Sequence, residues 1–163
     1  MARELNRKRS SPRTPDLLAE EIYRHINRSK RLLWTAAAHR LEEAGESIFI
    51  WQVLCFLVRN GPQTQRDLAY ANAQHPAGLS RLLDELEAER LIVRAVDPKD
   101  RRRSLVRATA KGKARFEAAS PQVWAAVDEA LGALTPKQRV DLRALLGILV
   151  PLDAPPKVKA FAS

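Results

Sequence analysis

The chain has little cysteine, no long apolar run and fewer acidic than basic residues. Its single cysteine, Cys55, cannot close an intramolecular disulfide, and the N-terminus lacks the apolar stretch of a signal peptide, so we expect a protein of the reducing cytoplasm. No apolar run approaches the roughly 18 residues of a membrane-spanning helix, which argues against a membrane partner. The 19 acidic residues against 28 Lys and Arg leave a formal charge of +9, and this charge favours a polyanionic partner, nucleic acid above all.

Residue patterns typical of catalysis or metal binding are also lacking. His25, His39 and His75 lie on different segments without the spacing of metal ligands, and there is no Gly-rich phosphate loop. Adjacent carboxylates such as Glu20 and Glu21 would point in different directions on a helix, so they are more typical of a solvated face than of an acid/base pair. We therefore expect no enzyme, no metal site and no cofactor.

The composition is that of one globular domain, or of one subunit of an intertwined oligomer. Hydrophobic residues make up 45% of the 163 residues, which is enough to fill a core. Residues 1–14 form a basic arm with five Lys or Arg against one Glu, and residues 151–163 form a Pro-rich tail. We expect both to be disordered; the alternatives are an arm that grips phosphates and a tail that docks on a partner subunit.

A long helix is predicted for residues 15–45. Thr14 and Pro15 offer a cap and a first helical position, apolar residues follow at helical spacing, and Gly45 ends the run. About 29 residues at roughly 1.5 Å each exceed the span of a small domain, so this helix needs a surface outside its own core, which a second subunit would supply. The next segment, "SIFIWQVLCFLVRNGP", has enough β-branched residues for a strand, but its length and its Gly-Pro stop favour a buried helix.

Two shorter helices follow in the order of a helix-turn-helix. Thr64 and Asp67 have the spacing of a capping box, which opens the helix "TQRDLAYA". His75 caps the helix "PAGLSRLLDELEAER", whose leucines form one apolar face. The outward face of this second helix begins with small or basic side chains, and its acidic residues come later. In a helix-turn-helix the N-terminal half of the second helix enters the major groove, where short side chains permit close approach and Arg reaches guanine.

A β-hairpin is predicted directly after this helix pair. The runs "LIVRA" (91–95) and "SLVRA" (104–108) are typical of strands, and residues 96–103 between them form the tip. A helix-turn-helix followed by a hairpin is a winged helix, and the tip is its wing.

The wing carries both cations and carboxylates. Arg101, Arg102 and Arg103 supply positive charge for a narrow minor groove. Asp97 and Asp100 would be repelled by DNA, so we expect them to fasten the wing by accepting hydrogen bonds from nearby Arg or turn amides. A solvated, charged hairpin tip is the alternative interpretation.

The run "LSRLLDELEAERLIVRAVDPKDRRRSLVRATAKGKA" resembles the MarR-type (multiple antibiotic resistance) transcriptional regulators. It is similar to that family's recognition helix, its wing and the Thr-x-x-Gly start of its next helix. The resemblance implies a homodimeric, ligand-responsive repressor in which each winged helix reads half of a near-palindromic operator and the terminal helices form the dimer interface. It also implies that Arg102 enters the minor groove with Asp100 as its buttress, and that Ser80 and Arg81 face DNA.

The candidate site residues fall into two groups. The candidate DNA contacts are Thr64, Gln65, His75, Ala77, Gly78, Ser80, Arg81, Arg101, Arg102 and Arg103. Family members bind a small aromatic effector between the dimer helices and the winged helix and then lose DNA affinity, and Trp34, His39, Trp51 and Cys55 are candidates for such a cleft. Core positions for Trp51 and Cys55 are the favoured alternative, and a redox role for Cys55 is disfavoured because its neighbours in sequence are apolar.

Two features depart from the family's pattern. Asn72 and Gln74 occupy turn positions where apolar residues are expected, so we predict that the two short helices pack loosely or through hydrogen bonds. Pro121 interrupts a helix expected from Ala110 to about Leu131, and a proline there removes a backbone hydrogen bond. We predict a kink or a break at this proline.

The predicted fold is mainly α with a small β-hairpin: a winged helix-turn-helix flanked by long dimerisation helices. Its parts are the arm (1–14), an N-terminal dimerisation helix (15–45), a DNA-binding domain (46–108), C-terminal dimerisation helices (109–150) and the tail (151–163). Double-stranded DNA, a second copy of the chain and a small aromatic effector are the expected partners. Two other functions stay open, a nonspecific architectural DNA-binding protein and a basic helical module that binds an acidic protein.

Overall fold

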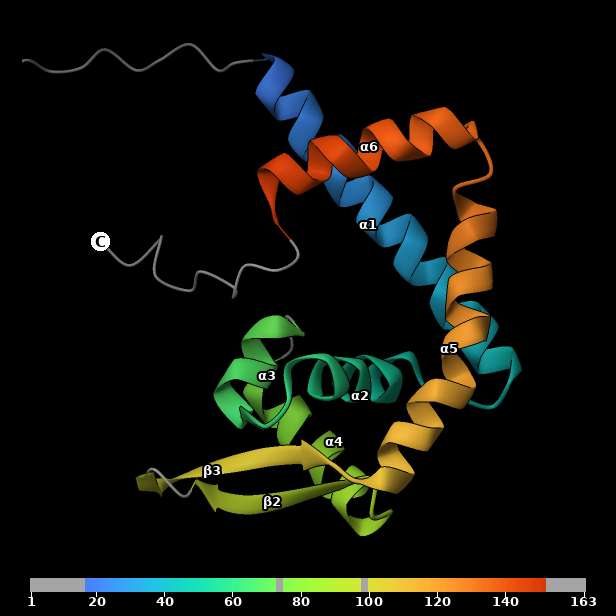
Figure 1. The fold of residues 1–163 in the computed structure, drawn as a ribbon. Helices are drawn as coiled ribbons and strands as arrows, with labels where there is room; N and C mark the ends of the chain where they lie inside the picture. The colour runs from blue at the N-terminus through green and yellow to red at the C-terminus, as the bar shows by residue number, and fades with distance from the viewer. Residues whose placement is uncertain (1–16, 73–74, 98–99, 152–163) are drawn as a thin grey trace, which may run out of the picture.

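The computed structural model describes residues 17–72, 75–97 and 100–151, and this part of the chain is mainly helical with one small antiparallel sheet (Figure 1). Its elements are α1 (Leu17–Glu43), α2 (Ile48–Asn60), β1 (Gln63–Thr64), α3 (Gln65–Ala71), α4 (Pro76–Ala88), β2 (Ile92–Asp97), β3 (Asp100–Ala108), α5 (Ala110–Ala130) and α6 (Pro136–Leu149). α3, α4 and the hairpin of β2 and β3 form a winged helix-turn-helix, so the predicted fold class is confirmed. The arm and nearly all of the tail lie outside the described residues.

Local sequence signals set the helix ends. At the start of α3 the Thr64 side chain accepts a hydrogen bond from the Asp67 amide, and the Asp67 carboxylate accepts one from the Thr64 amide. Thr135 and Gln138 make the same capping box at α6. After α1 the chain turns at Gly45, whose φ of 73° is the left-handed conformation that favours glycine. The cap predicted for α1 lies outside the described residues.

The core of the winged helix-turn-helix comes from α2, α3, α4 and the sheet. Its buried residues are Val53, Leu54, Leu57, Leu68, Leu79, Leu83, Leu86, Leu91, Ile92 and Val106. The leucine face predicted for α4 is therefore its core face, with Leu82 half-buried at the edge. Burying one such side chain contributes roughly 1.5–3 kcal/mol, so this cluster holds the two short helices against the sheet.

Asn72, at the end of α3, is one of the two polar residues predicted in the turn. It is buried, and its side-chain amide donates a hydrogen bond to the Leu68 carbonyl at 2.7 Å. This hydrogen bond lies within the last turn of α3, so hydrogen-bonded packing between α3 and α4 stays a prediction. Gln74 lies outside the described residues.

The sheet is larger than the predicted hairpin. The two-residue strand β1, which the sequence did not reveal, pairs with β3, and the strand order is β1-β3-β2. The strands β2 and β3 also extend to Asp97 and from Asp100, so the prediction that residues 96–103 form an irregular tip was wrong. Pairing continues almost to the turn because extended residues there satisfy their backbone polar groups across the hairpin.

β3 bulges at the three arginines. Val96 pairs with Ser104, but the next residue, Asp97, pairs with Asp100, so residues 101–103 lie between the two pairs. Extra residues on one strand bend it and turn its side chains away from regular alternation. The three arginines therefore belong to a bulged strand instead of a loop.

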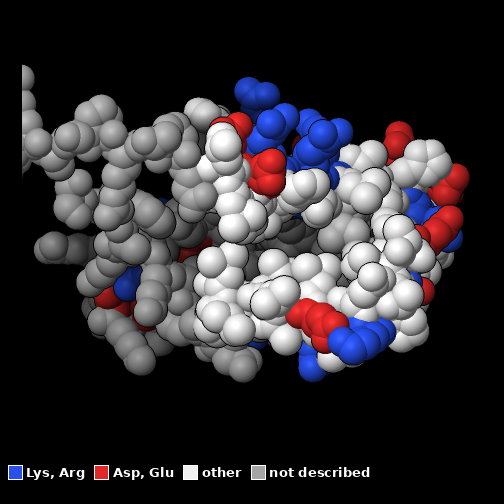
Figure 2. All heavy atoms as spheres, turned by 90° about the horizontal axis from the view of Figure 1, so that it is seen from above, with Lys and Arg blue, Asp and Glu red and all other residues white. Residues whose placement is uncertain are grey.

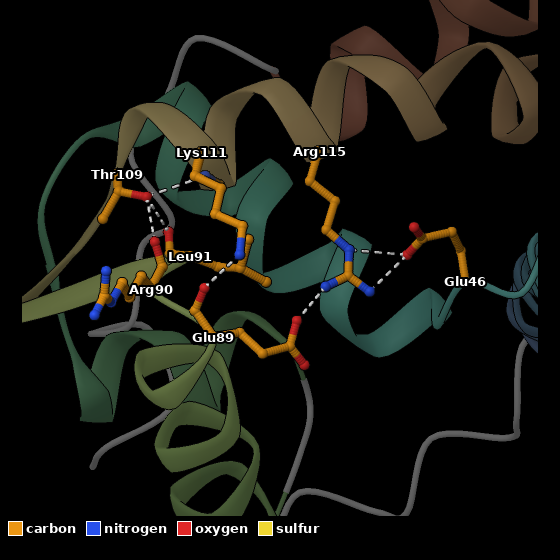
Figure 3. Close-up of polar contacts among 8 residues, drawn as sticks. Glu46, Glu89, Arg90, Leu91, Thr109, Lys111 and Arg115 are labelled. Carbon is orange, nitrogen blue, oxygen red and sulfur yellow. Dashed lines mark hydrogen bonds and ion pairs between the residues drawn. The ribbon is translucent and has the colours of Figure 1, made fainter.

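α5 begins with a close backbone contact at the base of the hairpin (Figure 3). The Thr109 hydroxyl accepts a hydrogen bond from the Gly112 amide at 3.1 Å and lies 2.7 Å and 3.1 Å from the Arg90 and Leu91 carbonyl oxygens, to which it donates. A Cβ on Gly112 would lie 2.1 Å from the Leu91 oxygen. The Thr-x-x-Gly motif thus caps the helix and allows helix backbone to touch strand backbone.

Pro121 lies inside α5, which runs unbroken from Ala110 to Ala130. Of the two predicted outcomes, a break is therefore wrong. The other outcome, a bend, is visible in Figure 1, where the α5 ribbon changes direction about half-way along. A proline in a helix has no amide hydrogen for the carbonyl four residues earlier, and its ring pushes that carbonyl aside.

The winged helix-turn-helix and a set of exposed apolar residues lie at opposite ends of the molecule (Figure 1). α1 packs along α5 with Ala37, Leu41, Ala119 and Val123 buried, and α6 crosses α1 at the end away from the sheet. The exposed large hydrophobic residues of α1 and α6 include Leu17, Leu18, Ile22, Tyr23, Ile26, Val140, Leu142, Leu145, Leu146, Ile148 and Leu149. Figure 2 looks onto this end and shows uncharged residues across its middle, with Lys and Arg gathered at the edges. No helix in the described part of the chain is long and apolar enough to cross a membrane.

Gly112→Ala is expected to lower the free energy of unfolding by about 1–3 kcal/mol, the usual cost of overpacking, because the new Cβ would overlap the Leu91 oxygen. Chemical denaturation followed by circular dichroism measures this change. Gly78→Ala is the matched control, since a Cβ at that helical position meets nothing within 4 Å, and it should be neutral or stabilise by up to about 1 kcal/mol. Equal stabilities of the two variants would contradict the packing assigned to Gly112.

Candidate nucleic-acid interface

The N-terminal half of α4 presents small residues followed by a cation. Ala77, Gly78 and Arg81 are exposed, whereas Ser80, predicted to face outward with them, is half-buried. The His75 Nδ1 accepts a hydrogen bond from the Ala77 amide at 3.3 Å and so caps the helix as predicted. Small side chains let the helix approach the floor of a DNA groove, and the guanidinium one turn later reaches further.

The start of α3 is largely occupied by contacts within the protein. The Thr64 hydroxyl donates to the Asp67 carboxylate at 2.6 Å, and Thr64 also belongs to β1. Thr64 and Gln65 are half-buried, whereas Arg66 and Tyr70, which the sequence analysis did not single out, are exposed on the same helix. A cation and a phenol on the first helix of a helix-turn-helix are groups suited to a phosphate backbone.

On the wing, one of the three arginine side chains is described. Arg103 is exposed, and the side chains of Arg101 and Arg102 lie outside the described ones. Asp97 is 8% exposed although it is a carboxylate near the end of a hairpin, whereas Asp100 is exposed. A carboxylate is stable in such a position when polar groups surround it, so the burial of Asp97 fits a residue that fastens the wing. For both aspartates this role stays a prediction.

Arg94 on β2 ties the hairpin to α4. Its guanidinium donates to the Glu87 carboxylate at 2.5 Å and to the Asp84 carboxylate at 2.7 Å, and its amide donates to Glu87 at 3.0 Å. The Arg94 side chain is 26% exposed, so these ion pairs are more shielded from water than an ordinary surface pair. Several charge-assisted hydrogen bonds between two elements fix the angle at which they meet.

The contacts with Arg94 lower the pKa of Glu87. The largest cause is the hydrogen bond from the Arg94 amide, and the hydrogen bond from its guanidinium follows. Because the pKa of Glu87 is lower in the folded than in the unfolded chain, its ionised form stabilises the fold at neutral pH. This contribution is lost as the pH falls through the folded pKa.

Arg115 on α5 pairs with the acidic end of α4 (Figure 3). Its guanidinium donates to Glu89 at 2.5 Å and to Glu46, in the turn before α2, at 3.1 Å. Lys111 donates to the Glu89 carbonyl at 2.8 Å. Arg94 and Arg115 thus neutralise Asp84, Glu87 and Glu89, the acidic residues that follow the small-residue start of α4. The sequence analysis did not identify these partners.

The four residues predicted to line an effector cleft lie on α1 and α2, and two of them line different grooves. Trp34 lines a groove between α1 and α2, and His39 lines a different groove between α1 and α5. Trp51 on α2 is half-buried, and its indole Nε1 donates to the Ser120 hydroxyl of α5 at 3.0 Å. Cys55 is half-buried one turn further along α2.

Cys55 has the environment of an unreactive thiol. Burial raises its pKa, and the nearby Arg59 opposes this effect only in part. A thiol with a raised pKa carries little of the reactive thiolate at neutral pH.

In the described part of the chain, no group of three or more His, Cys, Asp or Glu could hold a metal ion.

The groove beside Trp34 combines cations, aromatic rings and a buried acceptor. It is lined by Asn27, Lys30, Arg31, Trp34, Phe49, Gln52 and Asn72 and has a volume of about 330 Å³. The Trp34 and Phe49 ring centroids are 5.7 Å apart, and Gln52 Oε1 is buried without a hydrogen-bond partner in the described structure. A buried acceptor without a donor costs about 1–3 kcal/mol, so a ligand that donates to it would be stabilised. Of the residues that line this groove, the sequence analysis proposed only Trp34 as a ligand contact. Phe49 and Gln52 join it only when α2 packs against α1.

Comparison with known proteins finds a family model and a relative that match part of the chain. A model of the MarR family matches residues 51–103, from α2 through the helix-turn-helix to the bulged arginines. The HTH-type transcriptional repressor NicR of Pseudomonas putida is 31% identical over 100 residues, which are 61% of this chain and 63% of NicR. The chain from α2 to the bulged arginines is therefore similar to the MarR family.

Solved structures of regulators extend this likeness beyond the region that the MarR family model matches. BpsR of Bordetella bronchiseptica, whose DNA binding is regulated by 6-hydroxynicotinic acid, is 25% identical with a TM-score of 0.65, over 79% of this chain and 98% of BpsR. CouR of Rhodococcus jostii, solved with p-coumaroyl-CoA bound, is 26% identical with a TM-score of 0.64, over 86% of this chain and 100% of CouR. The long helices around the winged helix-turn-helix therefore belong to the shared fold.

Arg94→Ala is expected to lower the free energy of unfolding at neutral pH by about 1 kcal/mol, the scale of a partly exposed ion-pair network. The variant should also lose less stability than the wild type between pH 7 and pH 3, because the pKa of Glu87 is no longer lowered. Denaturation curves across this pH range measure both effects. Arg24→Ala, which breaks an exposed pair with Glu20 at 3.7 Å, is the control, and a response equal to that of Arg94→Ala would contradict the role of Arg94.

Proposed function

We propose that this protein is a member of the MarR family and a sequence-specific DNA-binding repressor that acts as a homodimer on a near-palindromic operator. The observation that carries the proposal is the pairing of two reading elements in one unit. The small-residue start of α4 and the bulged arginines of β3 belong to the same winged helix-turn-helix, and Arg94 links α4 to the hairpin. The likeness to the repressor NicR supports the same function.

DNA reading divides between the two elements. The start of α4 enters the major groove, where Gly78 permits close approach and Arg81 contacts a base edge. The arginines of β3 lie in the flanking minor groove, which attracts guanidinium groups when it is narrow. Arg66 and Tyr70 on α3, both exposed, contact the phosphate backbone and fix the register.

A second copy of the chain covers the apolar residues of α1 and α6. Four apolar residues of α6 are exposed in the single chain, from 57% at Val140 to 81% at Ile148, with Leu145 and Leu149 between these values. Contiguous exposed apolar surface of this kind marks an association site. A symmetric pair then presents two reading heads to half-sites about one DNA turn apart.

Arg102→Ala is expected to weaken operator binding by about 1–3 kcal/mol, the usual cost of removing an arginine that contacts a base. Titration of a fluorescent operator duplex at fixed salt measures the change. Lys137→Ala, which removes the same charge from the highly exposed start of α6, is the matched control and should bind as the wild type does. Equal affinities of the wild type and Arg102→Ala would remove the wing from the mechanism.

The operator for this titration comes from selection of preferred duplexes in a random pool, and its footprint separates the three candidate functions. Protection confined to a palindrome supports the repressor. Even protection of any duplex supports an architectural protein, and no retention on DNA supports a module for an acidic protein partner. In the first two cases log affinity should fall with log salt, because phosphate contacts release counterions.

We also propose that a small aromatic acid binds the groove beside Trp34 and releases the DNA. Lys30 and Arg31 are exposed cations that pair with no acidic side chain in the described structure, so they are available to a carboxylate. Trp34 and Phe49 supply ring surfaces, and Gln52 Oε1 accepts a hydrogen bond from a hydroxyl or a ring N–H. 6-Hydroxynicotinic acid, the regulator of BpsR, combines these three features. The ligand acts by its preference for the conformation that does not fit the operator.

Lys30→Met is expected to raise the concentration of 6-hydroxynicotinic acid that releases half of the operator by about tenfold, the equivalent of 1.4 kcal/mol, with operator affinity unchanged. Fluorescence anisotropy of the labelled operator measures both quantities. Lys113→Met, on the surface of α5, is the matched control and should release DNA at the wild-type concentration. An identical shift in both variants, or none in either, would place the effector elsewhere.

A further inference from the structure

The Ser120-Pro121 step lies where α5 passes from the winged helix-turn-helix to the other end of the molecule. We propose that Trp51, Ser120 and Pro121 together set the angle of this passage, and that this angle determines which spacing of operator half-sites the protein prefers. The inference rests on the proposed function, because spacing matters only to a dimer with two reading heads. These three residues position the reading heads without touching DNA.

α5 joins the two parts of the molecule that the angle relates. Its first turn is fixed to the hairpin through Thr109 and Gly112. Further along, α5 packs against α1 on both sides of the proline, with Ala119 and Val123 buried in one cluster with α1 residues. Pro121 lies within this second contact region, so a change of direction there turns the whole reading head relative to α1.

Ser120 and Trp51 add side-chain hydrogen bonds one residue before Pro121. The proline cannot donate to the Glu117 carbonyl, and its ring crowds that carbonyl. One residue earlier, the Ser120 hydroxyl donates to the Phe116 carbonyl at 2.6 Å and accepts the Trp51 indole N–H at 3.0 Å. A tryptophan of α2 is thereby hydrogen-bonded to the bend itself.

Trp51 also contacts α5 on both sides of the proline. Its ring centroid lies 5.8 Å from that of Phe116, before the bend, and 5.6 Å from that of Trp124, after it. The Arg59 guanidinium of α2 lies 5.5 Å from the Trp124 ring centroid, a cation–π contact that adds to the same attachment. Because one side chain packs against both halves, α5 cannot bend further or straighten without breaking a contact to α2.

A change of the angle at the bend displaces the reading heads relative to the DNA. In a symmetric dimer a rotation at each Pro121 moves both reading heads in opposite directions. A base-pair step is about 3.4 Å, so displacements of this size change the half-site spacing that fits. The residues of the bend therefore act as determinants of operator spacing without contacting a base.

The bend is tested by spin-label distances within one protomer. The spin labels are attached at Ala88→Cys on α4 and at Ala133→Cys beyond α5, both exposed positions, in a Cys55→Ser background. The distance between the two labels reports the angle of the bend. Dilution with unlabelled protein isolates the distances within one chain. Pro121→Ala should shift the mean distance by about one base-pair rise or more. Trp51→Phe, which keeps a ring but loses the indole donor, and Ser120→Ala should broaden the distribution. Pro136→Ala, at the first position of α6 where no helix hydrogen bond is lost, is the control and should match the parent protein.

Selection of duplexes with varied half-site spacing completes the test. Pro121→Ala should prefer a spacing different from that of the wild type, and Pro136→Ala should not. Superimposable distances in all variants, or an unchanged spacing preference, would overturn the proposal. If Pro121→Ala does not fold, the widths measured for Trp51→Phe and Ser120→Ala decide. Should the wild type bind no duplex, the proposed function fails, and the distances still decide whether these residues set the bend.

Discussion

The contact on which the rest of the structure depends is the meeting of the α5 backbone with the chain at the start of β2. The Leu91 carbonyl accepts a hydrogen bond from the Thr109 amide at 2.9 Å, and Gly112 leaves the space that a Cβ would fill. Because α5 leads from this contact past α2 to α1, it carries the position of the reading elements to the opposite end of the molecule. Under the proposed function, this connection is the physical path by which a contact at one end of the molecule changes the position of the reading elements at the other.

The arginines of this basic protein fall into two groups, those paired within the fold and those exposed to solvent. Arg94 and Arg115 are used within the fold, where they neutralise the acidic end of α4 and join it to the hairpin and to α5. Arg66, Arg81 and Arg103 are exposed at the end of the molecule that carries the winged helix-turn-helix. The formal charge of +9 favours a polyanionic partner, and the arrangement of acids and bases decides which surface such a partner would meet.

The parts of the fold that the sequence predicted are those fixed by residues close together in the chain. The capping box at Thr64 joins residues three positions apart, and the leucine face of α4 follows from helical periodicity. The strand β1 could not be predicted in this way, because two residues carry no periodicity and Gln63 becomes a strand residue only by pairing with Val106. The bulge at the arginines was missed for the same reason, since register belongs to a pair of strands.

The sequence by itself determined the order of the helices, their ends, the winged helix-turn-helix and the small-residue start of α4, because short-range sterics and hydrogen bonds decide these features. Tertiary structure decided which side chains meet. The indole of Trp51 finds Ser120 across 69 positions of the chain, and the groove beside Trp34 exists because α1 lies against α2. Such meetings depend on how buried surfaces fit together once the helices have formed, and the spacing of residues along one chain does not encode that fit locally.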